Sequence, residues 1–140
     1  MSSASAVLPI AAMMLLVFVV GAALLAQRSR EMRERRIHPQ KVATAAQMAA
    51  TLQRTNIADN FRNLFETPVL FYALCLAIAA TQSATPALVS GLWAYVALRV
   101  AHSAIHCTYN RVMHRFAAFA AGFVLLAGLW AAFAFTLLAR

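Results

Sequence analysis

Residues 6–26 read AVLPIAAMMLLVFVVGAALLA and contain no charged side chain. A helix of this length rises about 30 Å, enough to cross the hydrocarbon core of a bilayer. The basic segment QRSREMRERR follows at residues 27–36, and residues 1–5 carry no basic side chain. We therefore expect a first membrane span rather than a secretory signal. The pairs Arg30 with Glu34 and Glu31 with Arg35 are four residues apart, so the helix should continue to about residue 36.

Three further apolar segments follow, at about residues 57–82, 86–109 and 116–139. Hydrophobic side chains make up 63% of the 140 residues, charged side chains make up 11%, and the mean hydropathy is +0.71. An ordinary soluble domain does not have this composition. The sequence predicts an all-α fold, an integral membrane four-helix bundle that forms one domain over residues 1–140 with a cytosolic loop at 28–56.

The basic residues are concentrated in one part of the chain. The net charge is +8, and eight of the twelve basic residues lie between Arg28 and Arg62, whereas the turn at residues 81–86 has no charge. Basic loops stay on the cytosolic side of a membrane, so we expect both termini outside, an N-out and C-out topology. The basic residues are not interleaved with aromatic residues in the way that nucleic-acid-binding surfaces are, so the expected partners are membrane lipids and no nucleic acid.

The third apolar segment contains polar side chains on one face. Residues 99–115 read RVAHSAIHCTYNRVMHR, and Arg99, His102 and His106 recur at steps of three and four, which is helical spacing. Ionisable groups inside a span are costly unless they face a bundle interior or a wet cavity, so they indicate a functional site. The alternative is that they only tie helices together or reach up to the membrane surface.

A second polar face begins the second span, where Asp59, Arg62, Asn63 and Glu66 share one side of a helix. Pro68 follows directly and should loosen the helix near the carbonyl of Leu64. If the second and third spans form a hairpin that turns near residue 84, the two polar faces meet at the same depth. They would then line a ligand site, or form an interhelical network of Glu66 with Arg99 or His102 that needs no ligand.

The two histidines could in principle bind a metal ion, because they are four residues apart on one face. The neighbouring Arg62 and Arg99 would repel a cation, so we predict no metal site. The cationic neighbourhood instead favours an anionic ligand.

Two segments, DNFRNLFETPVLFY at residues 59–72 and WAYVALRVAHSAIHCTYNRVMHRF at residues 93–116, resemble the MAPEG superfamily, the membrane-associated proteins in eicosanoid and glutathione metabolism. The similarity is to its bacterial members in particular. The most specific elements are Asn63-x-x-Glu66 and Arg99 with ring-bearing residues three and seven positions later. The order and lengths of all four spans agree with the family.

The resemblance implies a homotrimer in the bacterial inner membrane, with glutathione held between subunits near the cytosolic end. Asn63 and Glu66 resemble the residues that hold the amino end and backbone of glutathione. The thiol-activating arginine of the family corresponds to Arg115 or Arg111. The full set implied to bind glutathione is Arg62, Asn63, Glu66, Arg99, His102, His106 and Tyr109.

Two hypotheses of function follow. The first is a glutathione-dependent transferase or peroxidase that acts on a lipophilic small molecule, an electrophile arriving from the bilayer. The second is a non-enzymatic lipid-binding protein or accessory membrane subunit on the same scaffold. The second arises because Asp59 stands where the family has an arginine, seven positions before Glu66, and an acid there would repel a carboxylate of glutathione.

Overall fold

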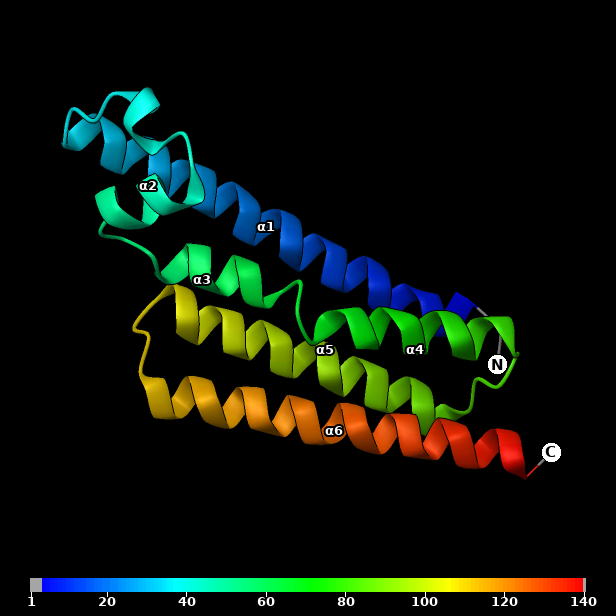
Figure 1. Cartoon of the computed structure of the whole chain (residues 1–140). Coiled ribbons are helices and arrows are strands. Elements are labelled where there is room, and N and C mark those ends of the chain that lie inside the picture. The colour runs from blue at the N-terminus through cyan, green and yellow to red at the C-terminus, as the bar shows by residue number, and fades with distance from the viewer. Residues whose placement is uncertain (1–3, 140) are drawn as a thin grey trace.

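The computed structural model describes residues 4–139, and every regular element among them is a helix (Figure 1). Four helices or helix pairs are long and apolar enough to span a membrane: α1, α3 with α4, α5 and α6. The chain is therefore an all-helical, four-span membrane protein, as the sequence predicts. The elements are α1 (Ala4–Glu34), the 3-10 helix η1 (Pro39–Val42), α2 (Ala45–Thr51), α3 (Asn56–Asn63), α4 (Pro68–Ala80), α5 (Pro86–Cys107) and α6 (Val112–Leu138).

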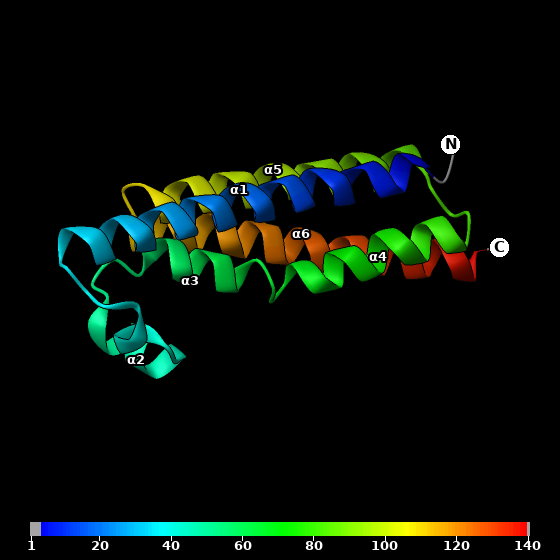
Figure 2. The same cartoon turned by 90° about the horizontal axis from the view of Figure 1, so that it is seen from above.

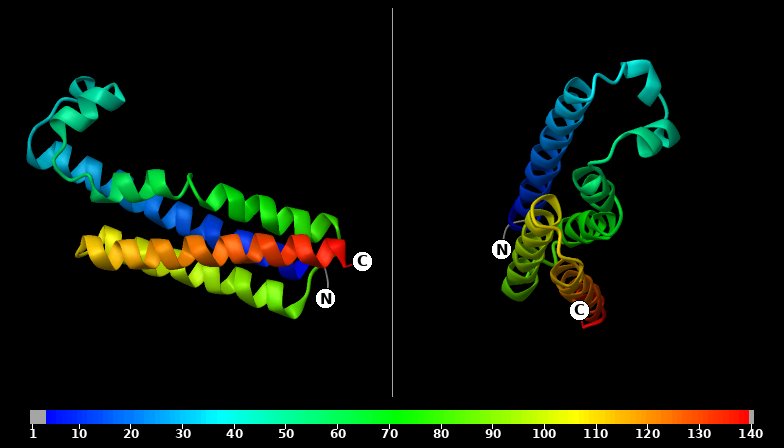
Figure 3. Two further views of the ribbon diagram at one scale, coloured as in Figure 1. Left: turned by 60° about the horizontal axis from the view of Figure 1, so that its bottom comes forward. Right: turned by 90° about the vertical axis from the view of Figure 1, so that its left-hand side faces the viewer.

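The long helices run roughly along one axis, with both ends of the chain at one end of the bundle (Figure 2). Helix α5 packs against α6, and α1 packs against α3, α4 and α5. The segment with η1 and α2 lies at the opposite end, beyond α1 and α3 (Figure 3). We call this the basic end, since it includes most of the arginines between residues 28 and 62.

The second span is broken where the sequence predicts it. Helix α3 ends at Asn63 and α4 starts at Pro68. The turn between them contains hydrogen bonds that span three residues instead of four, such as the bond from Phe65 N–H to the Arg62 carbonyl at 2.9 Å. Proline has no N–H to donate to the carbonyl of Leu64, so the regular ladder stops one turn before it. The break leaves Glu66 in a turn, exposed at the side of the bundle.

The core of the bundle consists of apolar side chains from α1, α4, α5 and α6. Phe71 of α4 and Tyr95 of α5 stack with ring centroids 4.7 Å apart, and Met13 and Leu92 are fully buried beside them. Many large apolar residues on the outer faces are exposed, as expected of helices that contact lipid. This apolar core holds together the part of the bundle that lies away from the basic end. The polar side chains described below lie nearer the basic end.

A buried glutamate fastens the loop at the basic end to α1. Glu31 is 2% exposed, and its carboxylate accepts hydrogen bonds from the N–H groups of Gln53 (2.7 Å) and Arg54 (3.3 Å) and from Arg35 Nη1 (2.9 Å). The predicted pair of Arg30 with Glu34 also forms, at 2.7 Å, on the exposed side of the helix. The loop after α2 is thus fixed to the end of α1 by Glu31, and also by Arg35, which donates to the carbonyl of Thr51 at 2.7 Å, and by the ion pair of Arg54 with Glu34 at 3.2 Å.

Candidate functional site

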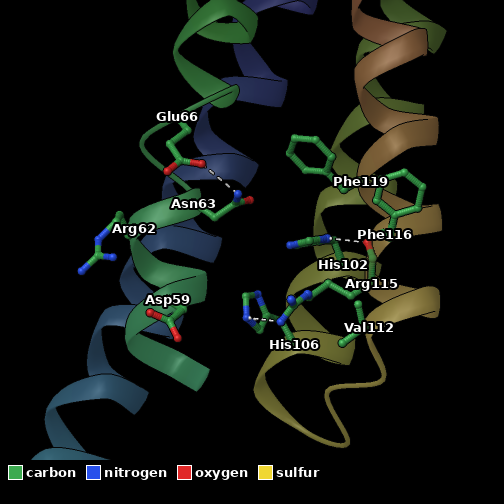
Figure 4. Close-up of a pocket in the computed structure, with 10 residues that line it drawn as sticks. All are labelled: Asp59, Arg62, Asn63, Glu66, His102, His106, Val112, Arg115, Phe116 and Phe119. Carbon is green, nitrogen blue, oxygen red and sulfur yellow. Dashed lines mark hydrogen bonds between the residues drawn. The ribbon is translucent and has the colours of Figure 1, made fainter. Parts of the chain in front are cut away.

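A pocket of about 330 Å³ lies between α3 on one side and α5 and α6 on the other (Figure 4). Its first wall comes from α3 and the turn after it, and its second wall comes from the facing sides of α5 and α6. The α3 residues and the α5 residues of the lining are about forty residues apart in the sequence, and they meet as the predicted hairpin of the second and third spans requires. The lining residues are Asp59, Arg62, Asn63, Glu66, His102, His106, Val112, Arg115, Phe116 and Phe119.

On the α3 wall, the side chain of Asn63 holds the carboxylate of Glu66. Asn63 Nδ2 donates to Glu66 Oε2 at 3.0 Å, and Asn63 Oδ1 accepts from Arg99 Nη2 at 2.6 Å. Arg99 is only 2% exposed and also donates to the backbone carbonyl of Asn63 at 3.3 Å. Because a guanidinium can only donate, it fixes which end of the Asn63 amide faces Glu66.

Arg99 therefore lies behind the pocket and does not line it. Asn63 stands between Arg99 and Glu66, so the direct interaction that the sequence suggested between this arginine and this carboxylate does not form. No carboxylate within residues 4–139 makes a salt bridge to Arg99. The Arg99 guanidinium therefore affects the pocket only by holding the Asn63 side chain, which in turn donates to Glu66.

On the opposite wall, Arg115 organises the loop between α5 and α6. Its Nη1 lies 3.0 Å from His106 Nε2 and donates to Asn110 Oδ1 at 2.8 Å. Asn110 has a positive φ of 47°, a conformation that asparagine tolerates better than most residues, at the turn between the two helices. The guanidinium is thus held at the mouth of the pocket by the turn that joins α5 to α6.

The hydrogen bonds of the two histidines fix their neutral tautomers. His102 Nδ1 lies 3.0 Å from the carbonyl oxygen of Arg115, which can only accept, so Nδ1 carries the proton and Nε2 has a lone pair. His106 Nε2 accepts from the Arg115 guanidinium, so its Nδ1 carries the proton. Among the described residues His102 Nε2 and His106 Nδ1 have no partner. Both nitrogens are buried, so the wall of the pocket contains one unpartnered acceptor and one unpartnered donor.

Besides Arg99, two predicted site residues lie outside the pocket of this single chain. Tyr109 is 56% exposed, and its hydroxyl lies 3.3 Å from His114 Nδ1. Arg111 is exposed at the start of α6 and does not line the pocket. Of the predicted residues, the structure brings together Arg62, Asn63, Glu66, His102, His106 and Arg115.

Sequence reasoning missed the apolar part of the lining. Val112, Phe116 and Phe119 project from α6 into the pocket, and the His102 and Phe119 ring centroids are 6.0 Å apart. Their spacing of four and three residues places them on one helical face. That pattern was available in the sequence, but in a membrane helix it does not distinguish a pocket wall from a lipid-facing stripe.

A comparison with known protein families identifies the family of this chain. The model described as "MAPEG family" matches residues 6–135, nearly the whole chain. The chain belongs to the MAPEG family. No curated protein and no solved structure matches it.

The pocket of this MAPEG protein has a lining of mixed sign. Arg62 and Arg115 are matched by the carboxylates of Asp59 and Glu66, which differs from the cationic lining that the sequence suggested. Within residues 4–139 no group of three His, Cys, Asp or Glu side chains could hold a metal ion. The arrangement suits a small molecule with both an ammonium and a carboxylate group, next to an apolar surface.

Proposed function

We propose that this MAPEG protein binds glutathione in the pocket and uses it as a transferase or peroxidase acting on lipophilic electrophiles. The observation that supports this most directly is the placement of Glu66 opposite Arg115 and the histidine pair across one pocket. Glutathione has one ammonium group, two carboxylates and a thiol, so it needs both signs of charge. The unpartnered nitrogens of His102 and His106 add hydrogen-bonding capacity that a polar ligand would satisfy.

Each wall has a separate role in this proposal. Glu66, oriented by Asn63, binds the ammonium group, and Arg62 binds a carboxylate by charge-assisted hydrogen bonds. The His106 N–H donates to a second acceptor of the ligand. Arg99 serves as a positioning residue through Asn63, since it does not reach the pocket surface.

Bound glutathione supplies a thiol whose ionised form is the nucleophile. Arg115 favours the ionised form, because a cation nearby lowers the pKa of an acid. The His102 Nε2 lone pair can accept the proton. Arg115 is preferred to Arg111 for this role because only Arg115 lines the pocket within one chain.

The apolar side of the pocket gives a route from the bilayer. Phe116 is 62% exposed at the outer edge of the lining, so a lipophilic electrophile can approach past it without crossing the polar walls. We propose association into a homotrimer, in which a neighbouring copy covers this open side and brings the exposed Tyr109 and Arg111 near a pocket. The basic end is proposed to face the cytosol of a bacterial cell, where glutathione is present, with both termini outside the inner membrane.

Calorimetry on the purified, detergent-solubilised protein tests the proposal. Glutathione should bind, and so should an analogue whose thiol is replaced by a methyl group, since the charged walls recognise the peptide ends. Only glutathione should then support conjugation of a lipophilic aryl halide. Absence of binding by both compounds would contradict the proposal, whereas binding without conjugation would limit it to glutathione recognition.

One observation favours the second candidate, a lipid-binding or accessory subunit without catalysis. Asp59 places an exposed carboxylate at the pocket, where it repels a ligand carboxylate. On this second hypothesis Asp59→Arg should create or strengthen glutathione affinity. On the enzyme hypothesis the wild type already binds, and the change should be neutral or harmful, as calorimetry on both proteins would reveal.

A further inference from the structure

The guanidinium of Arg115 is held by the protein at one nitrogen only. Nη1 lies 3.0 Å from His106 Nε2 (Figure 4) and donates to Asn110 Oδ1 at 2.8 Å. An Nη nitrogen carries two hydrogens, so these two acceptors occupy Nη1 fully. Nε and Nη2 make no hydrogen bond to any residue between 4 and 139. The edge of the guanidinium formed by Nε and Nη2 is therefore the part left for a ligand.

The two acceptors come from the end of α5 and the turn that follows it. His106 lies in the last turn of α5, and Asn110 lies between α5 and α6. The N–H of Asn110 donates to the carbonyl of Ile105 at 2.8 Å, and the N–H of Thr108 donates to that of Ala104 at 3.1 Å. Backbone bonds of this kind close the end of a helix and fix the turn after it. Asn110 Oδ1 therefore has a fixed place beside His106.

The backbone conformation of Asn110 restricts which side chains can supply this acceptor. Its φ of 47° is in the left-handed region, which most residues with a Cβ avoid and which asparagine and glycine tolerate. Glycine would keep the turn but has no side-chain acceptor. Aspartate would keep an acceptor but would add a negative charge beside Arg115. Asparagine combines the required backbone conformation with a neutral acceptor.

We propose that Asn110 is a positioning residue for Arg115. Together with His106 it holds Nη1, so that the edge formed by Nε and Nη2 faces the thiol of bound glutathione. This inference rests on the function proposed above, because the thiol belongs to that ligand. Asn110 does not line the pocket, so its effect on the ligand passes through Arg115. Without the bond, the long arginine side chain samples more rotamers and spends less time beside the thiol.

The holding of Arg115 can be tested on the full chain in detergent, without glutathione. Phenylglyoxal modifies arginine guanidinium groups, and peptide mass spectrometry measures the rate at Arg115 against that at Arg33, an exposed residue of α1. In Asn110→Gly, Arg115 should react about fivefold faster relative to Arg33, the contribution of one lost hydrogen bond. In Asn110→Asp, which keeps an acceptor, it should react no faster than in the wild type.

Gln82→Gly is the matched control for the backbone change. Gln82 also has a positive φ, of 52°, but it lies in the turn between α4 and α5, away from the pocket. Glycine there relieves the same kind of backbone strain, so the relative rate at Arg115 should stay as in the wild type. An increase in Gln82→Gly equal to that in Asn110→Gly would overturn the proposal.

A double-mutant cycle tests the consequence for the ligand. The ultraviolet absorbance of bound thiolate is followed against pH in the wild type, Asn110→Gly, Arg115→Gln and the double variant. Asn110→Gly should lower the thiolate fraction at neutral pH about threefold, less than Arg115→Gln does, because the cation is displaced but still present. The double variant should match Arg115→Gln, because the two residues act as one unit. Affinity for the analogue whose thiol is replaced by a methyl group should not change in Asn110→Gly.

The outcomes separate this proposal from the proposed function. Equal reactivity of Arg115 in the wild type and in Asn110→Gly would overturn the proposal, as would a double variant with clearly less thiolate than Arg115→Gln. Absence of glutathione binding by the wild type would overturn the proposed function and with it the role towards the thiol. The modification rates would then still show whether Asn110 holds Arg115.

Discussion

Glu31 and Glu66 are both glutamates at the basic end of the bundle, yet their surroundings differ. Glu31 is buried and accepts hydrogen bonds from two backbone N–H groups and one guanidinium. Glu66 is exposed at a pocket, accepts a hydrogen bond from Asn63, and forms no salt bridge within residues 4–139. The first carboxylate has its acceptor capacity satisfied by the protein, and the second has capacity left for a ligand.

The difference separates a structural acid from a binding acid. A carboxylate whose partners are all within the protein contributes to the stability of the fold, whereas one held in place by a single amide is positioned and still available. Glu66 is therefore expected to affect binding more than stability, and Glu31 the reverse. The predictions below test this division, from the largest expected effect to the smallest.

Removing the Glu31 carboxylate should give the largest effect on stability. Glu31→Ala leaves two backbone N–H groups without their acceptor and releases the loop, so the free energy of unfolding should fall by about 2–3 kcal/mol. Glu34→Ala is the matched control, since its ion pairs are on the exposed side and should matter little. Denaturant unfolding in detergent measures both, and an equal loss in the two variants would contradict the structural role of Glu31.

Removing the Arg115 guanidinium should affect the ligand rather than the fold. In Arg115→Gln the ultraviolet absorbance of bound thiolate at neutral pH should fall about tenfold, because the cation that lowers the thiol pKa is gone. Arg115→Lys should restore only part of it, as a point charge does not replace a planar guanidinium. Arg111→Gln is the control outside the pocket. A loss in Arg111→Gln alone would mean that the activating arginine comes from another copy.

Replacing Arg99 should give the smallest effect, which is a loss of glutathione affinity without a loss of stability. Arg99→Met removes a buried cation without a carboxylate partner, so thermal stability should not fall. The Asn63 amide would lose the donor that orients it towards Glu66, and glutathione affinity should drop about fivefold. Calorimetry and a melting curve on the same preparation check both halves. A clear loss of stability with unchanged affinity would assign Arg99 to the fold instead.

Most of the fold could be predicted from the sequence because the membrane imposes simple rules. Four long apolar segments and a proline at position 68 were enough to indicate four spans and the break in the second, since a long apolar segment in lipid satisfies its backbone hydrogen bonds within itself only as a helix. The role of Glu31 was not predictable. Its spacing from Arg35 indicated a pair of side chains along one helix. Its partners Gln53 and Arg54 lie more than twenty residues later, in a loop whose path the sequence did not indicate.

The site could be predicted in part. Helical spacing and the hairpin arithmetic brought Glu66 and His102 to one depth, and both line the pocket. The hairpin model gives the depth of each residue but not the direction in which its side chain points around the helix. It therefore did not show that Asn63 would separate Glu66 from Arg99. It also did not distinguish Arg115 from Arg111, because that depends on how the Asn110 turn directs the start of α6.

The central claim is that Glu66 is held ready for the ammonium group of glutathione. Calorimetry with glutathione and with N-acetylated glutathione, on the wild type and on Glu66→Gln, tests it most directly. The wild type should prefer the free amine by about tenfold or more, the contribution of one charge-assisted hydrogen bond, and Glu66→Gln should lose that preference while keeping its melting temperature. Equal binding of the two compounds by the wild type, or the same preference in Glu66→Gln, would contradict the account.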